Sequence, residues 1–282
     1  MFSAAVIKIG LDPVLVRLGG LSVHWYGLMY VLGIFAGIYF CMPYAQRRGI
    51  PRNTAYEIFW PIVVGSLVGG RLYYVLQSNF GWYLAHPQNI LATWEGGMAF
   101  YGAVFLGVAT GFVVSSLKRV SFAIVLDVAA VFIPIAQAIG RVGNIVNGDI
   151  VGYRSSLPWA TEYTNPHNTF VQLFVPYDPA AAYELLFSLA LFALIWVLRF
   201  RFRVPGTLFA LWLVLYSVGQ FLLFFDRANV VVALGLKQAQ LTALVVLAVT
   251  IPAWLLWSQA FASGTGGKTA SNLSPDAEAA SG

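Results

Sequence analysis

The sequence is poor in charge, in cysteine and in histidine. Only 10% of its 282 residues are Asp, Glu, Lys or Arg, whereas a soluble domain carries roughly a quarter. Its one cysteine, Cys41, lies in an apolar run, and its three histidines (His24, His86 and His167) are far apart. A lone cysteine excludes an intrachain disulfide, and this spacing forms no Cys/His cluster. These shortages exclude a soluble enzyme and lead us to expect neither a metal site nor a cofactor.

The chain is instead rich in long apolar stretches, with 59% hydrophobic and 16% aromatic residues. A helix needs about 20 apolar residues to cross a bilayer. Stretches of that kind occur at 23–44, 55–77, 97–117, 121–140, 181–198, 206–225 and 239–257. We therefore expect an all-α, polytopic integral membrane protein with seven transmembrane helices. The first twenty residues lack the pattern of a signal peptide and are expected to form an interfacial lead-in.

The basic residues predict the orientation of these spans. One side collects closely spaced cations: Arg47, Arg48, Arg52, Lys118, Arg119, Arg199, Arg201, Arg203 and Lys268. On the other side basic residues are sparser, and segment 78–96 has none. Because cytoplasmic loops are enriched in Lys and Arg, the N-terminus is expected outside and the C-terminus in the cytoplasm. Topology thus accounts for the excess of basic over acidic residues, and we expect no nucleic-acid partner.

One membrane domain, residues 1–257, is predicted, followed by a Gly/Ser/Ala/Thr-rich tail at 258–282 that we expect to be disordered in the cytoplasm. The longest connection, about 141–180, lies on the outer side in this topology. Loops of more than about 15 residues are usually functional or disordered.

Polar residues gather at the outer ends of six predicted spans. They are His24, Tyr26, Arg71, Glu95, Gly96, Gly97, Tyr101, Arg141, Asn144, Asn147, Asp149, Tyr183, Glu184, Gln220, Asp226 and Arg227. Placing a charge at mid-bilayer costs about 2.5 kcal/mol or more, so charged residues within a span indicate a partner or a functional role. Each one alone is compatible with an ordinary helix-end cap. Together they predict a polar cavity open to the outer leaflet, whereas Glu57 and Asp127, near inner ends, are expected to be structural.

The cavity is suited to an anionic lipid headgroup. Arginine presents a planar fork of donors that matches phosphate, which makes Arg71 and Arg141 candidate ligands. A neighbouring carboxylate, Asp149 or Glu184, could orient an arginine or accept a proton.

The strongest local motif runs from Gly140 to Asp149 and reads GlyArgValGlyAsnIleValAsnGlyAsp, with Gly152 shortly after it. Arg141, Asn144 and Asn147 recur every three residues, which turns them in a similar direction on a helix or turn. The glycines permit close approach of the backbone to a ligand. A tight Gly/Asn turn that merely ends a helix remains the alternative interpretation.

This motif resembles the Gly-Arg-x-Gly-Asn-Phe-x-Asn-Gly-Glu stretch of the prolipoprotein diacylglyceryl transferase family. Further blocks are similar and stand in the family's order: HisTrpTyrGly at 24–27, GlyGlyArgLeuTyrTyrVal at 69–75, TrpGluGlyGlyMetAlaPheTyrGly at 94–102, LeuProTrp at 157–159 and AspProAlaAlaAlaTyrGlu at 178–184. The resemblance covers roughly residues 10 to 257. The family's seven-span, N-outside topology agrees with the spans predicted above.

The resemblance implies a multi-pass enzyme of the bacterial plasma (inner) membrane. It would move the diacylglyceryl group of phosphatidylglycerol to the lipobox cysteine thiol of a preprolipoprotein, forming a thioether and releasing glycerol phosphate. Carried over by position, the catalytic candidates are Arg141 for the phosphate, Asp149 in place of the family's Glu, Glu184 and Tyr101. The candidates for substrate binding are Tyr26, Arg71, Asn144, Asn147, Gly152 and His24.

Some positions depart from the family pattern. Tyr101 stands where many members have a histidine proposed as the base, and tyrosine, with an unperturbed pKa of about 10, is a poor base at neutral pH. Gln220 and Phe224 replace an Arg and a Glu, and we consider that Asp226 and Arg227 restore this pair further along the helix. Asp149, Glu184 and a tyrosine all remain candidate proton acceptors.

Two other functions stay open. One is a family member that binds phospholipid but has lost turnover or changed its acceptor. The other is a small-solute transporter, which is disfavoured because the sequence shows neither interrupted spans nor internal repeats.

Overall fold

The computed structural model describes residues 6–19, 21–92 and 96–264, and it is mostly helical. Six helices in this part of the chain are long and apolar enough to cross a membrane: α1 (Trp25–Arg47), α2 (Arg52–Gln77), α4 (Phe100–Leu117), α5 (Phe122–Asn147), α6 (Ala180–Leu198) and α8 (Gln238–Ala262). Helix α7 (Thr207–Leu223) is apolar but has 17 residues, about 25 Å at 1.5 Å per residue. A polytopic membrane protein is thus confirmed, while the seventh span and the orientation stay predictions.

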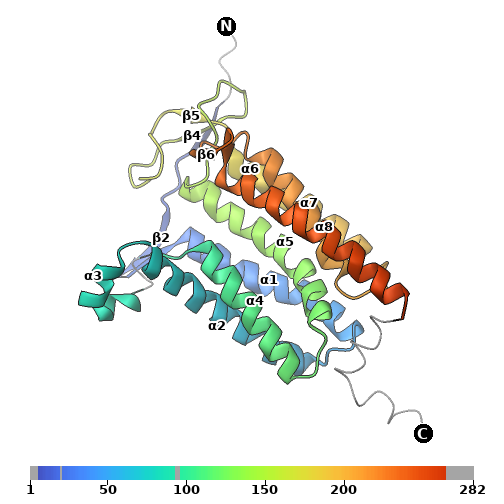
Figure 1. Cartoon of the computed structure of the whole chain (residues 1–282). Helices are drawn as coiled ribbons and strands as arrows, with labels where there is room; N and C mark the ends of the chain where they lie inside the picture. The colour runs from blue at the N-terminus through green and yellow to red at the C-terminus, as the bar shows by residue number, and fades with distance from the viewer. Residues whose placement is uncertain (1–5, 20, 93–95, 265–282) are drawn as a thin grey trace. The chain divides into compact units, whose positions relative to one another are not determined.

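Besides the helices, the structure has short strands that the sequence did not predict (Figure 1). Strand β1 (Ile7–Ile9) pairs in parallel with β4 (Thr161–Tyr163), and β4 pairs antiparallel with β5 (Pro176–Tyr177). Strands β2 (Val14–Leu18) and β3 (Leu21–His24) form one hairpin, and β6 (Val231–Ala233) and β7 (Leu236–Lys237) form another. Backbone groups outside a helix need partners, and strand pairing supplies them. The N-terminal lead-in is therefore tied to the long 141–180 connection.

The chain divides into two compact units. The first comprises residues 1–41 and 127–262, and the second residues 42–126 and 263–282. The predicted tail beyond residue 264 lies outside the described residues, and helix α8 runs five residues past its expected end at Trp257.

Close helix packing in the second unit depends on glycine. A Cβ on Gly69 would lie 2.3 Å from the carbonyl oxygen of Gly102, and one on Gly107 would lie 2.3 Å from Ser66 Oγ. Small residues let membrane helices approach closely, where van der Waals contact replaces the hydrophobic effect. Helices α2 and α4 thus form a tight pair, joined through α3 (Phe80–Ala85) and the 3₁₀ turn η1 (Pro87–Ile90).

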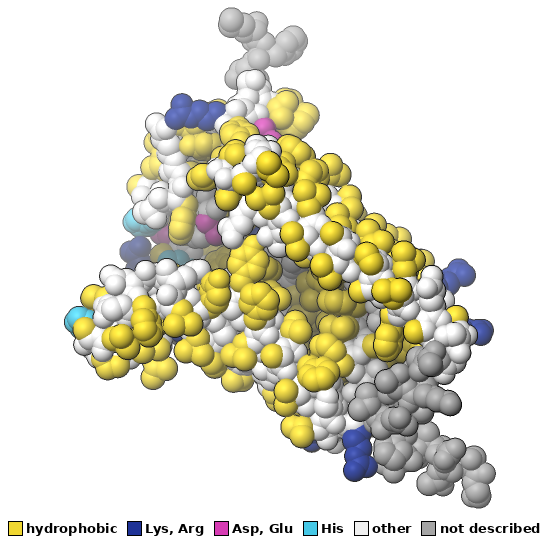
Figure 2. Space-filling model, in the orientation of Figure 1, with side chains coloured by type: hydrophobic (Ala, Val, Ile, Leu, Met, Phe, Trp, Pro, Cys, Tyr) yellow, Lys and Arg dark blue, Asp and Glu magenta, His cyan; other side chains and the backbone are white. Residues whose placement is uncertain are grey.

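In the first unit, glycines likewise allow α1 and α5 to pack closely. A Cβ on Gly33 would lie 2.9 Å from the carbonyl oxygen of Ala136, and one on Gly143 would lie 3.0 Å from Tyr26 Cα. Helices α6, α7 and α8 of this unit lie side by side (Figure 1). Large apolar side chains remain exposed along the helices, Phe35, Leu186 and Val245 among them, and Figure 2 shows apolar side chains over much of the visible helical surface. Such a surface suits lipid contact.

The two carboxylates expected to be structural have protein partners. Asp127 is 1% exposed and accepts the backbone N–H groups of Gly206 and Phe209, at 2.9 and 3.0 Å, so it caps the start of α7. In the second unit Glu57 pairs with Lys118 at 2.5 Å.

Substituting Gly102→Ala is expected to destabilise the protein by about 1–3 kcal/mol, because the new Cβ would press on the Gly69 carbonyl and on Tyr73 at 2.3 Å. Thermal unfolding in detergent measures the effect. Gly81→Ala is the matched control, since its Cβ would meet nothing within 4 Å. Equal unfolding temperatures for the two variants would contradict the glycine-dependent packing.

Candidate functional site

A buried carboxylate, Glu184, is the centre of the polar cluster in the first unit. It lies in the first turns of α6 and is 1% exposed. Its Oε2 is 2.5 Å from Nη2 of Arg141, and its Oε1 accepts from Nη1 of Arg227 at 3.1 Å. A buried charge is tolerated only when it is paired and hydrogen-bonded. Glu184 therefore holds two guanidinium groups, from the end of α5 and from the residues after α7.

Helix α5 continues through most of the Gly140–Asp149 motif, because it ends at Asn147 and not near the predicted residue 140. Arg141 and Asn144 therefore face the same way one turn apart, and Arg141 Nη1 donates to Asn144 Oδ1 at 3.1 Å. The amide of Asn144, which is 4% exposed, donates to both oxygens of Asp149 at 3.1 Å. Of the three residues expected to converge (Arg141, Asn144 and Asn147), Arg141 and Asn144 are hydrogen-bonded to each other, and Asp149 joins them through Asn144.

Two residues that the sequence did not single out hold the end of this motif. Tyr163 donates its hydroxyl to the carbonyl of Ile145 at 2.9 Å, and the amide of Asn168 donates to the carbonyl of Asn147 at 2.9 Å. Burial, with the nearby charge of Asp149, raises the pKa of Tyr163 to about 12, so its hydroxyl stays a donor. The sequence offers no clear signal for Tyr163, because the three-residue strand β4 that contains it is too short to show alternation.

Gly152 is the point where three segments meet. Its N–H donates to the carbonyl of Asp178 at 2.9 Å, and it forms a β-bridge with Arg227. A Cβ at this position would lie 2.7 Å from Asp178 Cβ and 2.9 Å from the carbonyl oxygen of Asp226. Close packing around residue 152 therefore explains why glycine occupies this position, which the sequence alone could not show.

Arg227 and Asp226 face different partners. The guanidinium of Arg227 pairs with Glu184 and lies 4.5 Å from the centre of the Phe224 ring. Burial lowers the pKa of Arg227, and Glu184 opposes this shift. Burial and contact with Asp178 raise the pKa of Asp226 to about 6. The hypothesis that Asp226 and Arg227 restore a mutual pair is corrected: Arg227 is paired with Glu184.

The cluster also contains unused polar atoms. Gln137, one turn before Arg141 on α5, donates to the hydroxyl of Tyr216 at 3.2 Å. Gln137 Oε1 and Arg227 Nε are buried without a hydrogen-bond partner among the described residues. A position four residues before Arg141 shares its face of the helix, which is the signal that could have identified Gln137.

The two aromatic candidates near α1 lie in different surroundings. Tyr26, in the first turn of α1, contacts Tyr30 through its hydroxyl at 3.3 Å and approaches the Gly143 backbone. His24 is exposed at the end of β3, where it pairs with Val14.

Arg71 and Tyr101 belong to the second unit. Arg71 is 6% exposed and donates to the carbonyl oxygens of Asn89, Ile90, Gly96 and Gly97, at distances of 2.6 to 2.9 Å. Its guanidinium was expected to bind a headgroup, yet most of its donors are used inside the protein. Tyr101 is the second residue of α4 and packs on the ring of Phe100. Thr93 to Glu95, which include Trp94 and Glu95 of the predicted motif, lie outside the described residues.

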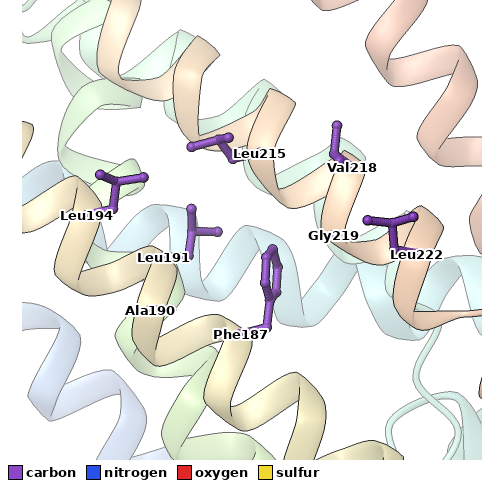
Figure 3. Close-up of a pocket in the computed structure, with 8 residues that line it drawn as sticks. All are labelled: Phe187, Ala190, Leu191, Leu194, Leu215, Val218, Gly219 and Leu222. Atoms are coloured by element: carbon purple, nitrogen blue, oxygen red, sulfur yellow. The ribbon is translucent and has the colours of Figure 1, made fainter.

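An apolar groove of about 270 Å³ lies between α6 and α7 (Figure 3). Its lining is entirely aliphatic or aromatic apart from one glycine: Phe187, Ala190, Leu191, Leu194, Leu215, Val218, Gly219 and Leu222. Phe187 follows Glu184 by three residues on α6, so one end of the groove lies within a helical turn of the charged cluster.

Comparison with known proteins gives consistent matches. A family model described as prolipoprotein diacylglyceryl transferase matches residues 13–257. Proteins named phosphatidylglycerol–prolipoprotein diacylglyceryl transferase are similar to this chain: one from Bordetella avium (strain 197N) is 39% identical over 221 residues, covering 77% of this chain and 81% of the relative. One from Geobacter sulfurreducens is 33% identical over 220 residues (77% and 82%), and one from Methylobacillus flagellatus is 34% identical over 257 residues (87% and 95%).

Substituting Arg71→Lys is expected to destabilise the protein by about 1–3 kcal/mol, because an ammonium cannot replace a planar fork that serves four carbonyls. Thermal unfolding in detergent measures the loss, with the exposed Arg17→Lys as control. An unfolding temperature like that of the control would show that the four hydrogen bonds contribute little.

Proposed function

Because the chain belongs to the prolipoprotein diacylglyceryl transferase family, we propose that it transfers the diacylglyceryl group of phosphatidylglycerol to a prolipoprotein, at a site built on Glu184. The observation that carries this proposal is the buried pairing of Arg141 and Arg227 with one carboxylate, at the motif most specific to the family. Two guanidinium groups suit a phosphodiester, and a single buried carboxylate keeps both in place before the lipid binds.

The finer topology is part of the proposal. The distribution of basic residues supports an outer N-terminus, a cytoplasmic C-terminus and a seventh span formed by α7, in the plasma membrane of a bacterium. In that orientation the ends of α5 and α7 that carry Arg141 and Arg227 face outward. A lipid headgroup of the outer leaflet and a secreted cysteine would meet there.

The reaction requires a sulfur nucleophile and a stabilised leaving group. The thiolate of the lipobox cysteine attacks the diacylglyceryl carbon that carries the phosphate, a C–S bond forms, the C–O bond breaks, and glycerol phosphate leaves with the electron pair. Arg141 and Arg227 stabilise the charge that develops on the departing phosphate. Side-chain exposures of 21% for Arg141 and 13% for Arg227 leave part of each fork available to a ligand.

The remaining polar groups orient this pair and handle the proton. Asn144 bridges Arg141 to Asp149, and we assign Asp149 as acceptor of the thiol proton because it is exposed and sits beside the phosphate ligands. Glu184 is held in two ion pairs and therefore serves as a positioning group. Gln137 Oε1 and Arg227 Nε offer an acceptor and a donor to the lipid headgroup.

The other predicted residues are assigned by their surroundings. Tyr26 borders the lipid site from α1, and Asn147 and Gly152 shape the backbone around it. His24, exposed just before α1, is proposed to contact the substrate at the outer surface, and Tyr101 stays a catalytic candidate by its position in the family motif. Arg71 is proposed to shape the loop that contains Gly96 and Gly97.

The proposal is tested with purified protein in lipid nanodiscs, phosphatidylglycerol and a lipobox peptide. We expect release of glycerol phosphate and a peptide mass increased by one diacylglyceryl group. Arg141→Ala is expected to lower kcat/KM about 10²–10³-fold, the usual effect of removing a group that stabilises transition-state charge, while the exposed Arg17→Ala remains active.

Lipid binding without release of glycerol phosphate by the unmodified protein would favour the alternative of a phospholipid-binding member without turnover, consistent with Tyr101, Gln220 and Phe224 at the family's His, Arg and Glu positions. Full activity of Arg141→Ala would remove Arg141 from the phosphate site.

The groove between α6 and α7 is proposed to hold one acyl chain of the lipid, because it is apolar and adjoins the charged cluster (Figure 3). Leu215→Trp would fill it and is expected to raise KM for long-chain phosphatidylglycerol more than KM for a short-chain form, by about tenfold, since one misplaced methylene in an apolar pocket costs about 1–3 kcal/mol. Leu186→Trp, on an exposed face of α6, is the control. An unchanged ratio of the two KM values would place the acyl chain elsewhere.

A further inference from the structure

Lys237 is a buried cation outside the polar cluster described so far. It is 4% exposed and ends β7, directly before α8. Its ammonium donates to the carbonyl of Phe224 at 2.5 Å, to that of Phe225 at 3.3 Å and to that of Arg227. It also lies 4.9 Å from the centre of the Tyr153 ring. A buried ammonium requires such compensation, and here the three carbonyl acceptors come from one short segment, residues 224–227.

That segment is the turn after α7, from the C-cap residue Phe224 to Arg227. The last carbonyls of a helix have no partner within the helix and carry partial negative charge. Lys237 supplies the donor, and Gln240 assists it: the Gln240 amide donates to the carbonyl of Phe221 at 3.1 Å, and its oxygen accepts the Lys237 N–H at 3.0 Å. Two buried side chains, Lys237 at the end of β7 and Gln240 in the first turn of α8, thereby hold the end of α7 and the turn after it.

The closed turn carries Arg227. Its main chain is held from one side by Lys237 and from the other by the bridge to Gly152. Its long side chain has many rotamers, and immobilising them costs conformational entropy. A fixed backbone limits those rotamers to the ones that reach Glu184, 3.1 Å away. We propose that Lys237 is a positioning residue, which fixes the turn after α7 and so holds Arg227 against Glu184.

The charge of Lys237 also acts on the carboxyl of Asp226 in the same turn. The groups that face Asp226 are Asp178, from the residue pair before α6, and Lys237, with Arg227 next to it in the chain. Burial and Asp178 raise the pKa of Asp226 to about 6, and Lys237 opposes that rise. Removal of the ammonium therefore raises the pKa of Asp226 further, an effect that a purely steric role for Lys237 would not produce.

The positioning role is tested by the reactivity of Arg227 toward phenylglyoxal, read by peptide mass spectrometry on the intact protein in nanodiscs. We expect Arg227 to react at least about tenfold faster in Lys237→Met than in the unmodified protein, since a buried ion pair that loses its anchor opens more often. Lys237→Arg should restore protection. The exposed Lys8→Met is the matched loss of an ammonium, and Arg17 is the internal standard.

The charge effect has its own readout. In the unmodified protein the side-chain carboxyl ¹³C signal of Asp226 should titrate near pH 6, and in Lys237→Gln the midpoint should move upward, because glutamine keeps hydrogen-bond donors but has no charge. If Lys237→Met does not fold, Lys237→Gln is used for both measurements. Unchanged protection of Arg227 together with an unchanged midpoint in a folded variant would overturn the positioning role.

The effect on the reaction rests on the proposed function. In the transfer assay Lys237→Met is expected to lower kcat/KM about tenfold, because Arg227, which stabilises the charge on the departing phosphate, is displaced and not removed. Faster modification of Arg227 in a protein that shows no transfer at all would support the positioning role and contradict the proposed function. An unchanged kcat/KM with fully exposed Arg227 would overturn the link from Lys237 to the reaction.

Discussion

The ion pairs of Glu184 are the constraint on which the rest of the first unit depends. A carboxylate that is 1% exposed in a membrane protein is stable only if its two cations are always in place. Arg141 reaches it because α5 extends beyond the apolar stretch, and Arg227 reaches it because the turn after α7 is closed. The strands and hydrogen bonds around Gly152 help to hold these ion pairs in place, since they connect the segments that carry Glu184, Arg141 and Arg227.

Much of this arrangement was accessible from the sequence. The positions of six long apolar helices follow from the length of apolar runs, and the direction shared by Arg141 and Asn144 follows from a spacing of three. The strands were missed because two to five residues are too few to show alternation. Gln137 and Lys237 were missed for a different reason: each is a single polar residue among apolar ones, and only tertiary contacts reveal its partners.

Arg71 illustrates where an argument from charge alone goes astray. A cation inside an apolar span indicates a strong interaction, but the sequence cannot say whether a ligand or the protein's own carbonyls provide it. Here Gly96 and Gly97 both adopt positive φ, at 86° and 81°, and turn their carbonyls toward the guanidinium. Left-handed backbone at two successive residues is accessible mainly to glycine. The Gly96–Gly97 pair of the motif at 94–102 is therefore explained by the hydrogen bonds that its carbonyls accept from Arg71.

The single cysteine also has a practical consequence. Cys41 is 5% exposed and lies within α1, where thiol reagents have little access. An acceptor whose reactive atom is a thiol can therefore be followed with a maleimide probe in the presence of the protein, because the loss of label reports the acceptor with little background. The same property provides a ready single-thiol background, in which cysteines introduced at chosen surface positions carry spectroscopic labels without prior removal of native ones.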